Sequence, residues 1–426
     1  LCSFNAKLKI GNIAQNNLID IWNSKSADYF RNKMSDYDLS HCLECKLFFN
    51  FKNYSSLPTT KYDLHATDDI TYPSQMSFEI SNLCNLECVM CNENFSSAIS
   101  KRKNIPLRKN AYTERFIQQL DIFIPHLKIA TFIGGEPLLI KAYFKIWNNI
   151  IANNKKCKIH VQTNATILNK EFLTLLESNS FEVGVSIDAI SKDKFEAIRI
   201  GANHSEVFKN IDILYQYYIA GKINMNINFC LMINNWQELP LMLQYCNERN
   251  LSLKIIHINS PIYLDIKYQP SKVIHGITDQ LEKIELNNNN TVLQLRNINT
   301  YNDAIENIKT YHSFSNKVYA FFENHAQYDL YELFNLIKIQ IDNFVLASDM
   351  HVDDAARLDR LIQNYINELE EDIQVKKNIC LHILYHYSSF EHDADIENID
   401  FNLYRNILEN YNKLVVDIKN NIYVAY

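Results

Sequence analysis

The sequence predicts an α/β fold, a partial (β/α)6 barrel with a small N-terminal metal-binding module and a mostly α-helical C-terminal domain. Two observations predict the barrel: apolar runs rich in β-forming residues alternate with helical patterns, and polar or glycine-containing motifs follow these runs. Strands that alternate with helices pair in parallel through right-handed crossovers. A third observation predicts the helical domain, because residues 277–426 contain neither Gly nor Pro to interrupt helices.

The expected elements fall into three parts of the chain, separated by a linker at 58–75 and by the end of the last strand. We place the strands at 76–80, 129–133, 159–162, 183–187, 223–232 and 253–258, and the helices between them at 114–124, 142–152, 171–176, 207–218 and 239–246. Helical spacing of apolar residues recurs at 333–339, 355–366 and 403–415. The expected domains are therefore 1–65, 74–275 and 276–426, the last without a chemistry-bearing motif.

Composition excludes several classes of function. A chain of 426 residues with 47% hydrophobic content can bury a large core. A net charge of −7 without an extended basic block predicts no nucleic-acid partner, because such binding needs cations that neutralise phosphates. No apolar run of about eighteen residues occurs, so no membrane span is expected. Clustered cysteines without a disulfide framework, and an amino end without a signal-peptide pattern, predict a cytoplasmic protein.

Three cysteines with CxxxCxxC spacing, Cys84, Cys88 and Cys91, lie within eight residues of a chain that has ten cysteines in all. A short loop of this kind can direct three thiolates to one [4Fe–4S] cluster, which normally takes four. One iron is then open to a substrate or cofactor. The alternatives are a zinc site or a group of buried thiols. Zinc would need a fourth ligand nearby, and His126 is the only His or Cys between Cys91 and Cys157.

Three further motifs follow expected strands, where the loops of a β/α barrel build the active site. They are Gly134-Gly135-Glu136-Pro137, Thr163-Asn164-Ala165-Thr166 and Ser186-Ile187-Asp188-Ala189. Together with the three cysteines, and in this order, they resemble the motifs of the radical S-adenosylmethionine (SAM) enzymes. The resemblance covers roughly residues 74–260. It implies a partial barrel that holds a [4Fe–4S] cluster on Cys84, Cys88 and Cys91, with SAM bound at the open iron.

The resemblance also implies roles for the glycine motif. Two adjacent glycines are informative in a chain with only seven, because they permit a close approach that a Cβ would forbid. Backbone groups of Gly134 and Gly135, together with Glu136, would receive the methionyl amino group of SAM. We expect Glu136 to lie in a loop over the barrel mouth and to affect SAM affinity more than folding. A simple tight turn is the alternative.

Four more residues are implied in SAM binding. Ser186 and Asp188 would face the ribose and the methionyl end, and Asn164 lies at the corresponding end of the third strand. Arg199 would suit the SAM carboxylate, since a guanidinium binds a carboxylate with two hydrogen bonds. Alternatively, Arg199 is a surface residue of a helix. Met90 replaces the aromatic residue common before the third cysteine, which removes one stacking contact with adenine.

A second metal site is expected near the amino end. Cys2 is followed by an expected helix at 18–33 and by the CxxC pair Cys42 and Cys45. The segment resembles the SPASM and twitch modules of radical SAM enzymes, which bind an auxiliary iron–sulfur cluster and usually follow the barrel. Structural zinc, with His41 as a ligand, is the alternative. Because the chain begins with Leu1 rather than Met, we expect part of the module, including a fourth ligand, to precede it.

These features predict a radical SAM enzyme, in which a 5′-deoxyadenosyl radical takes a hydrogen atom from a substrate. The SPASM-like segment favours a peptide or protein substrate, since such modules are common among peptide-maturing members. The resemblance also implies a reductant such as flavodoxin or ferredoxin. Two alternatives stay open: an enzyme that acts on a small molecule in cofactor biosynthesis, and a non-catalytic iron–sulfur or zinc protein on the same barrel.

Overall fold

The computed structural model describes residues 9–35, 71–106, 111–178, 180–258, 264–269, 271–286, 291–325, 327–347 and 380. Cys2, His41, Cys42 and Cys45, and the helices expected at 355–366 and 403–415, lie outside these residues. The chain divides into two compact units, residues 1–229 with 251–254, and residues 230–250 with 255–426. The boundary between the units thus falls within the fifth strand, whereas the sequence suggested residue 275. The proposed domain limits stay a prediction.

Six strands form one sheet whose spatial order is the order of the chain, from β1 to β6. They are β1 (Gln75–Phe78), β2 (Ile129–Phe132), β3 (Lys158–Thr163), β4 (Phe181–Ser186), β5 (Asn224–Leu231) and β6 (Ser252–His257). All neighbours from β1 to β5 pair in parallel. This sequential parallel order is that of a β/α barrel, and six strands close only part of it. The predicted fold class is confirmed.

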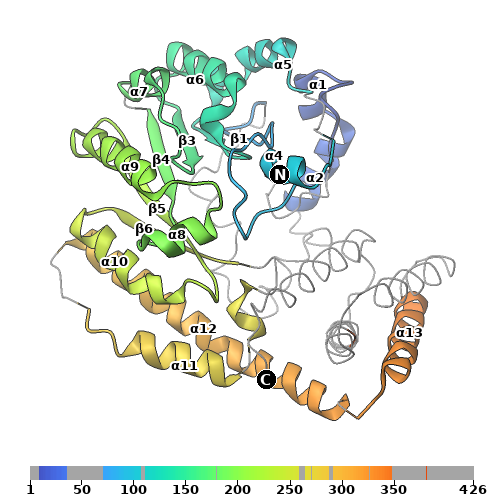
Figure 1. Cartoon of the computed structure of the whole chain (residues 1–426). Coiled ribbons are helices and arrows are strands. Elements are labelled where there is room, and N and C mark those ends of the chain that lie inside the picture. The colour runs from blue at the N-terminus through green and yellow to red at the C-terminus, as the bar shows by residue number, and fades with distance from the viewer. Residues whose placement is uncertain are drawn as a thin grey trace. The chain divides into compact units, whose positions relative to one another are not determined.

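Helices connect the strands, and those of the first unit cover one face of its strands (Figure 1). They are α5 (Glu114–Gln119), α6 (Lys141–Asn153), α7 (Lys170–Leu176), α8 (Lys192–Ile198), α9 (His204–Ile219) and α10 (Leu239–Glu248). Asparagine side chains cap two of these helices: Asn169 accepts from the Phe172 N–H and Asn203 from the Glu206 N–H. The short helix α8 was not predicted from the sequence, and it brings Arg199 to the site described below.

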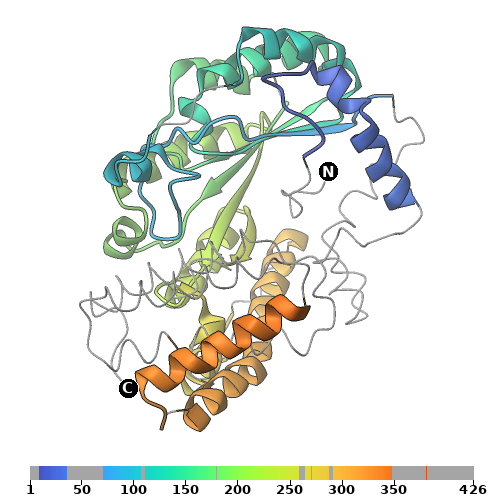
Figure 2. The ribbon, with the colours of Figure 1, turned by 90° about the vertical axis from the view of Figure 1, so that its right-hand side faces the viewer.

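The core under the helices of the first unit is aromatic. Trp147 of α6 is fully buried and contacts Phe132 of β2, Phe172 of α7 and Phe181 of β4. Burying each such side chain contributes roughly 2 kcal/mol or more. In Figure 2, teal and green helices of the first unit lie over its strands. The packing holds β2 and β4 against α6 and α7.

The two faces of β3, β4 and β5 differ in chemistry. Successive side chains of a strand point to opposite faces, and one face is apolar and buried against the helices: Ile159, Val161, Val183, Val185, Met225 and Ile227. The other face carries His160, Gln162, Glu182, Ser186, Asn226 and Asn228. Parallel sheets covered on both sides are apolar throughout. The polar face is therefore the inner face of the partial barrel.

The described part of the second unit is helical beyond β6, as predicted. It contains α11 (Ser271–Glu282), α12 (Val292–His325) and α13 (Leu330–Ala347). Helices α11 and α12 lie side by side (Figure 1), and the buried Tyr301 hydroxyl of α12 donates to the Leu281 carbonyl of α11 over 2.9 Å. Among the described residues, no helix combines the length and apolar character needed to cross a membrane.

The helix predicted at 18–33 is two helices, α1 (Leu18–Trp22) and α2 (Lys25–Ser35). The break occurs because the Ser24 hydroxyl accepts from the Ala27 N–H, which begins a new helix. Two hydrogen bonds attach α1 to α5: the Leu18 N–H donates to Gln119, and Arg115 donates to Asn17. Helix α1 of the expected amino-terminal module is thereby bonded to α5, which lies between β1 and β2.

Candidate functional site

The three cysteines lie on one loop that follows β1 and ends at α4 (Ser97–Arg102). All three are reduced and half-buried. The loop backbone is bonded to the end of α8, because the Glu87 N–H donates to the Ile200 carbonyl and the Val89 N–H to the Ile198 carbonyl, both over 2.9 Å. These two bonds flank Cys88, and they bring Arg199 to it.

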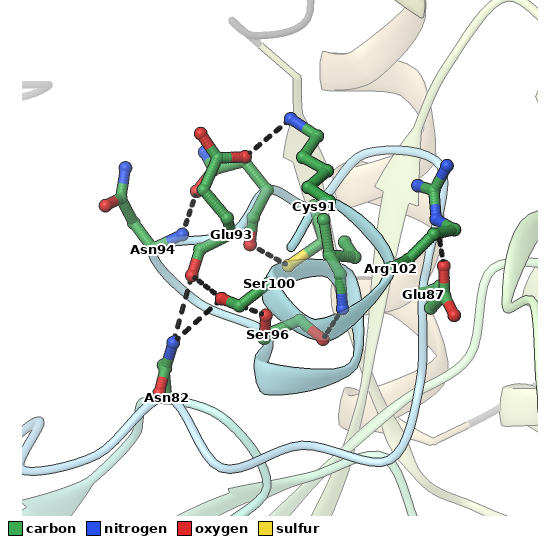
Figure 3. Close-up of polar contacts among 11 residues, drawn as sticks. Asn82, Glu87, Cys91, Glu93, Asn94, Ser96, Ser100 and Arg102 are labelled. Carbon is green, nitrogen blue, oxygen red and sulfur yellow. Dashed lines mark hydrogen bonds and ion pairs between the residues drawn. The ribbon is translucent and has the colours of Figure 1, made fainter. Parts of the chain in front are cut away.

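The end of the loop is closed by side-chain hydrogen bonds around Glu93 and Ser96 (Figure 3). Asn82 and Ser100 both donate to the Glu93 carbonyl over 2.9 Å. The Ser96 hydroxyl donates to the Leu86 carbonyl over 2.6 Å and accepts from the first turn of α4. Residues before, between and after the cysteines are thus bonded together. These hydrogen bonds define the shape of the loop.

The surroundings of the sulfur atoms suit a cluster. The Leu86 N–H and the Asn164 amide donate to the Cys84 sulfur over 3.5 and 3.9 Å, which is the direction that stabilises a thiolate. Burial raises the pKa of the Cys84 thiol and raises that of Cys88 to about 12, and a bound metal would act in the opposite direction, because it stabilises the thiolate. Within the described residues, no group of three or more His, Cys, Asp or Glu is arranged to hold one metal ion. The sulfur atoms that bind a four-iron cluster lie further apart than the ligands of a single metal ion, because each thiolate binds a different iron.

The turn after β2 packs against the beginning of this loop. The Gly135 N–H donates to the Ser81 carbonyl over 3.0 Å. A Cβ on Gly134 would lie 2.7 Å from the Ser81 oxygen, and one on Gly135 would lie 2.2 Å from the Leu83 oxygen. Gly134 also has a φ of +109°, which favours glycine. The close approach predicted for these glycines is therefore made by the protein's own backbone.

Tyr143 of α6 contacts the residues at which the cysteine loop and the glycine turn begin. Its buried hydroxyl lies 2.8 Å from the Phe78 carbonyl at the end of β1 and 2.7 Å from the Ile133 carbonyl after β2. The same hydroxyl accepts from the Ile80 N–H. One side chain thereby connects the starting points of the cysteine loop and of the glycine turn.

Glu136 lies in the loop after β2, and its side chain is buried there, only 1% exposed. Its Oε1 accepts from the Thr163 hydroxyl over 2.7 Å and from the Leu138 N–H over 3.1 Å. Its Oε2 accepts from the Asn164 N–H over 2.7 Å. Burial raises the pKa of this carboxyl, although the hydrogen bonds oppose the shift. The carboxylate therefore joins the end of β2 to the end of β3.

Asn164 is held between Glu136 and the cysteine loop. Its side-chain amide donates to the side-chain oxygen Oδ1 of Asn85 over 3.2 Å and also to the Cys84 sulfur. The next residue, Ala165, has a φ of +54°, unusual for a residue with a Cβ. The structure thus brings together the motifs after β1, β2 and β3, which sequence position alone only places at one end of the sheet.

Asp188 and Arg199 form an ion pair, with Oδ2 and Nη2 2.7 Å apart and side chains 0% and 8% exposed. The interpretation of Arg199 as a surface residue is therefore wrong. Both charges act on Cys88: Arg199 lowers the pKa of its thiol and Asp188 raises it, although burial has the larger effect. Ser186, in contrast, lies on the inner face of the sheet, where its hydroxyl accepts from the Gln162 amide. Gln162, Asn226 and Asn228 were not among the predicted site residues. The signal for them is the alternation of polar residues in strands that were expected to be apolar.

Two family models match the chain. The model of the radical SAM superfamily matches residues 78–246, and the SPASM model, described as an iron–sulfur cluster-binding domain, matches residues 1–46. They confirm the expected cofactors, namely a [4Fe–4S] cluster, SAM and an auxiliary iron–sulfur cluster. The ligands assigned to each stay a prediction.

Curated relatives include the probable GTP 3′,8-cyclase of Methanococcus maripaludis strain C6, 28% identical over 200 residues, 46% of this chain and 62% of the relative. The GTP 3′,8-cyclase of Clostridium botulinum strain Hall is 29% identical over 133 residues, 31% of this chain and 40% of the relative. The chain thus spans less than two thirds of the length of these relatives.

Solved structures with partial similarity include anSMEcpe with bound AdoMet, at a TM-score of 0.38 and 20% identity over 49% of this chain and 58% of that one. Streptococcus suis SuiB bound to the precursor peptide SuiA gives a TM-score of 0.36 and 15% identity over 60% of this chain and 58% of that one. The matched models show a radical SAM domain at residues 78–246, preceded in the chain by a SPASM iron–sulfur cluster-binding domain at residues 1–46.

Proposed function

We propose that the protein cleaves SAM reductively and uses the resulting 5′-deoxyadenosyl radical to take a hydrogen atom from a peptide or protein. One observation carries the first part: the cysteine loop, the Glu136–Asn164 link and the Asp188–Arg199 pair meet at the carboxyl ends of the first four strands. In β/α barrels, this end of the sheet builds the active site.

In this proposal, Cys84, Cys88 and Cys91 hold the [4Fe–4S] cluster. When bound, the cluster supplies the electron that breaks the C5′–S bond of SAM. The backbone of the Gly134–Gly135 turn receives the methionyl amino group, while Glu136 fixes the position of that turn and of Asn164. Asp188 and Arg199 present opposite charges beside Cys88, where the charged groups of SAM would bind. Their burial keeps water from screening these interactions.

The peptide substrate is supported by the SPASM segment at residues 1–46, because the resemblance associates such segments with peptide maturation. In the same proposal Cys2, Cys42 and Cys45 hold the auxiliary cluster. The location is cytoplasmic, where clustered thiols stay reduced, and a flavodoxin or ferredoxin supplies electrons. A second candidate is an enzyme that acts on a small molecule such as a nucleotide, supported by relatives named as GTP 3′,8-cyclases.

The proposal is tested with protein whose clusters have been reconstituted under anaerobic conditions. After reduction in the presence of SAM, we expect 5′-deoxyadenosine, detected by liquid chromatography. A Cys88→Ala variant should produce none, whereas the control Cys157→Ala, which removes a buried thiol outside the loop, should retain the parent rate. If the parent protein binds iron but yields no 5′-deoxyadenosine, the non-catalytic alternative is correct.

The two substrate candidates are separated by isotope transfer. Deuterated GTP, and a deuterated short peptide encoded by a gene neighbouring that of this protein, are supplied in separate reactions. The true substrate transfers deuterium into 5′-deoxyadenosine. Transfer from GTP and not from the peptide would replace the peptide proposal with the nucleotide one.

A further inference from the structure

A row of side-chain amides crosses the inner face of β3, β4 and β5. The Asn226 amide donates to the Asn228 carbonyl oxygen over 2.9 Å, and the Asn228 amide donates to the Gln162 carbonyl oxygen. The Gln162 amide in turn donates to the Ser186 hydroxyl. Each amide thus uses one N–H and points in the same direction along the row. We call these four residues the amide row.

Gly184 of β4 makes room for the amide row. In the sheet register, Gly184 lies between Gln162 on β3 and Asn226 on β5. A Cβ on Gly184 would lie 2.6 Å from the Gln162 oxygen and 2.7 Å from the Asn228 nitrogen. Glycine within a strand weakens it by about 0.5–1 kcal/mol relative to alanine. A Cβ at this position would displace the ends of the Gln162 and Asn228 side chains, so the present position of the row depends on Gly184.

The amide row leaves donors and an acceptor for a ligand. A side-chain amide has two N–H groups and one carbonyl oxygen, and the row uses one N–H of each amide. Among the described residues, the Asn226 oxygen has no hydrogen-bond partner. Gln162, Ser186 and Asn226 are only half-buried. A peptide unit, with one N–H and one C=O, matches this mixture of donors and acceptor.

The charges of this face do not match a polyanion. On the described inner face of β3 to β5, the basic side chains are Lys158 and His160, at the amino-terminal end of β3. His160 lies 2.9 Å from Glu182, and Lys158 also acts on Glu182, whose pKa is lowered mainly by the His160 hydrogen bond. Glu182 therefore already interacts with both basic side chains of this face. A triphosphate would need further Arg or Lys side chains to neutralise it.

We propose that the amide row, together with Gly184, is the substrate subsite, and that it binds an uncharged peptide backbone rather than a nucleotide triphosphate. The inference rests on the proposed function, because Ser186 at one end of the row is the residue assigned to SAM. Hydrogen bonds from fixed amides would hold one peptide unit beside the radical. Fixing a single target hydrogen is what such an enzyme needs from its barrel.

The test uses blocked triglycine, acetyl-Gly-Gly-Gly-N-methylamide, which carries backbone amides and no charge. Saturation-transfer NMR on the oxidised, SAM-loaded holoenzyme should detect its binding. We expect the signal to fall at least fivefold in Asn226→Leu, which removes the free acceptor, and in Gly184→Ala, which displaces the row. The matched control is Thr131→Val on β2 of the same face, outside the row, which should retain the parent signal. Iron content and circular dichroism verify that each variant is folded and loaded.

GTP and tripolyphosphate are measured in the same way, and neither should give a signal that depends on Asn226. The proposal is overturned if blocked triglycine does not bind the parent protein, or if both variants bind it as the parent does. A GTP signal lost in Asn226→Leu would also overturn it. These outcomes are independent of 5′-deoxyadenosine formation, so the subsite can fail while the SAM-cleaving activity stands.

Discussion

Arg199 and Asp188 form a buried ion pair beside Cys88, although the two residues lie on different elements, Asp188 after β4 and Arg199 at the end of α8. Burying two charges is unfavourable unless the pair is well bonded, and apolar residues often give equal stability. The position of the pair next to the predicted cluster therefore indicates a role in the site. The hydrogen bonds on either side of Cys88 keep Arg199 in place.

Arg199→Met should destabilise the first unit by about 3–5 kcal/mol, because Asp188 would remain buried without its counter-charge. The double variant Arg199→Met with Asp188→Leu should recover part of this loss, since no charge is then left alone. Chemical denaturation of the three proteins measures both effects. Equal or greater destabilisation in the double variant would show that the pair is not the source of the loss.

Glu136→Gln should lower both stability and SAM affinity. The neutral amide has one acceptor oxygen where the carboxylate has two. A donor from Thr163, Leu138 or Asn164 therefore loses its acceptor, which lowers the free energy of unfolding by about 1–3 kcal/mol. Asn164 and the glycine turn then shift, which weakens SAM binding. Thermal melting and equilibrium dialysis with SAM measure the two effects.

The control for this change is Glu177→Gln, whose side chain is exposed and pairs with Lys222 on the surface. Loss of this pair should change stability by less than about 1 kcal/mol. If Glu136→Gln weakens SAM binding while the melting temperature stays at the parent value, the carboxylate contacts SAM directly, as the sequence suggested.

The sequence predicted the strands and most helices because each depends on local periodicity, as in β3 and α6. It did not predict the burial of Glu136 or Arg199. The Glu136 carboxylate and the Arg199 guanidinium each bind partners that follow a different strand, which local periodicity does not reveal. The contact of the glycine turn was also only partly predicted. The two glycines indicated a close approach, but the atom that approaches Gly134 is the backbone oxygen of Ser81, more than fifty residues earlier. The break between α1 and α2 depends on one hydroxyl hydrogen bond at Ser24, which apolar spacing does not reveal.

Asp265 should make the stability of the second unit depend on pH. Burial raises the pKa of this carboxyl from 3.8 to about 6, against the effect of the Lys267 N–H. The folded state therefore holds the proton more tightly than the unfolded state does. Stability should be highest below about pH 4 and fall by up to about 3 kcal/mol as the pH rises to 6.

Asp265→Asn removes this titration and keeps the oxygen that accepts from the Lys267 N–H. Hydrogen exchange of α12, corrected for intrinsic rates, should slow in the variant relative to the parent at pH 7.5 and match it at pH 4. The neighbouring Tyr311 should not contribute, since burial and Asp265 raise the pKa of its hydroxyl above this range. An unchanged difference between the two proteins at both pH values would contradict the prediction.

The amino-terminal cysteines should hold iron independently of the barrel cluster. In a protein with Cys84, Cys88 and Cys91 all changed to Ala, we expect residual iron, because Cys2, Cys42 and Cys45 are predicted to bind the auxiliary cluster. Adding Cys42→Ala should remove that iron. Metal analysis that finds zinc without iron in the first protein would support the structural zinc site instead.

Gly135→Ala should reduce cluster loading without unfolding the second unit. The new Cβ would lie 2.2 Å from the Leu83 oxygen and 2.6 Å from the Asn82 carbonyl carbon, and backbone cannot move aside as a flexible side chain does. The start of the cysteine loop must therefore shift, which displaces Cys84 from Asn164. We expect iron content to fall by at least half in the barrel site.

Gly276→Ala is the control, because a Cβ in α11 meets nothing within 4 Å and alanine favours a helix by about 1 kcal/mol. Full iron loading in Gly135→Ala would show that the contact between the glycine turn and the loop does not position the cluster ligands.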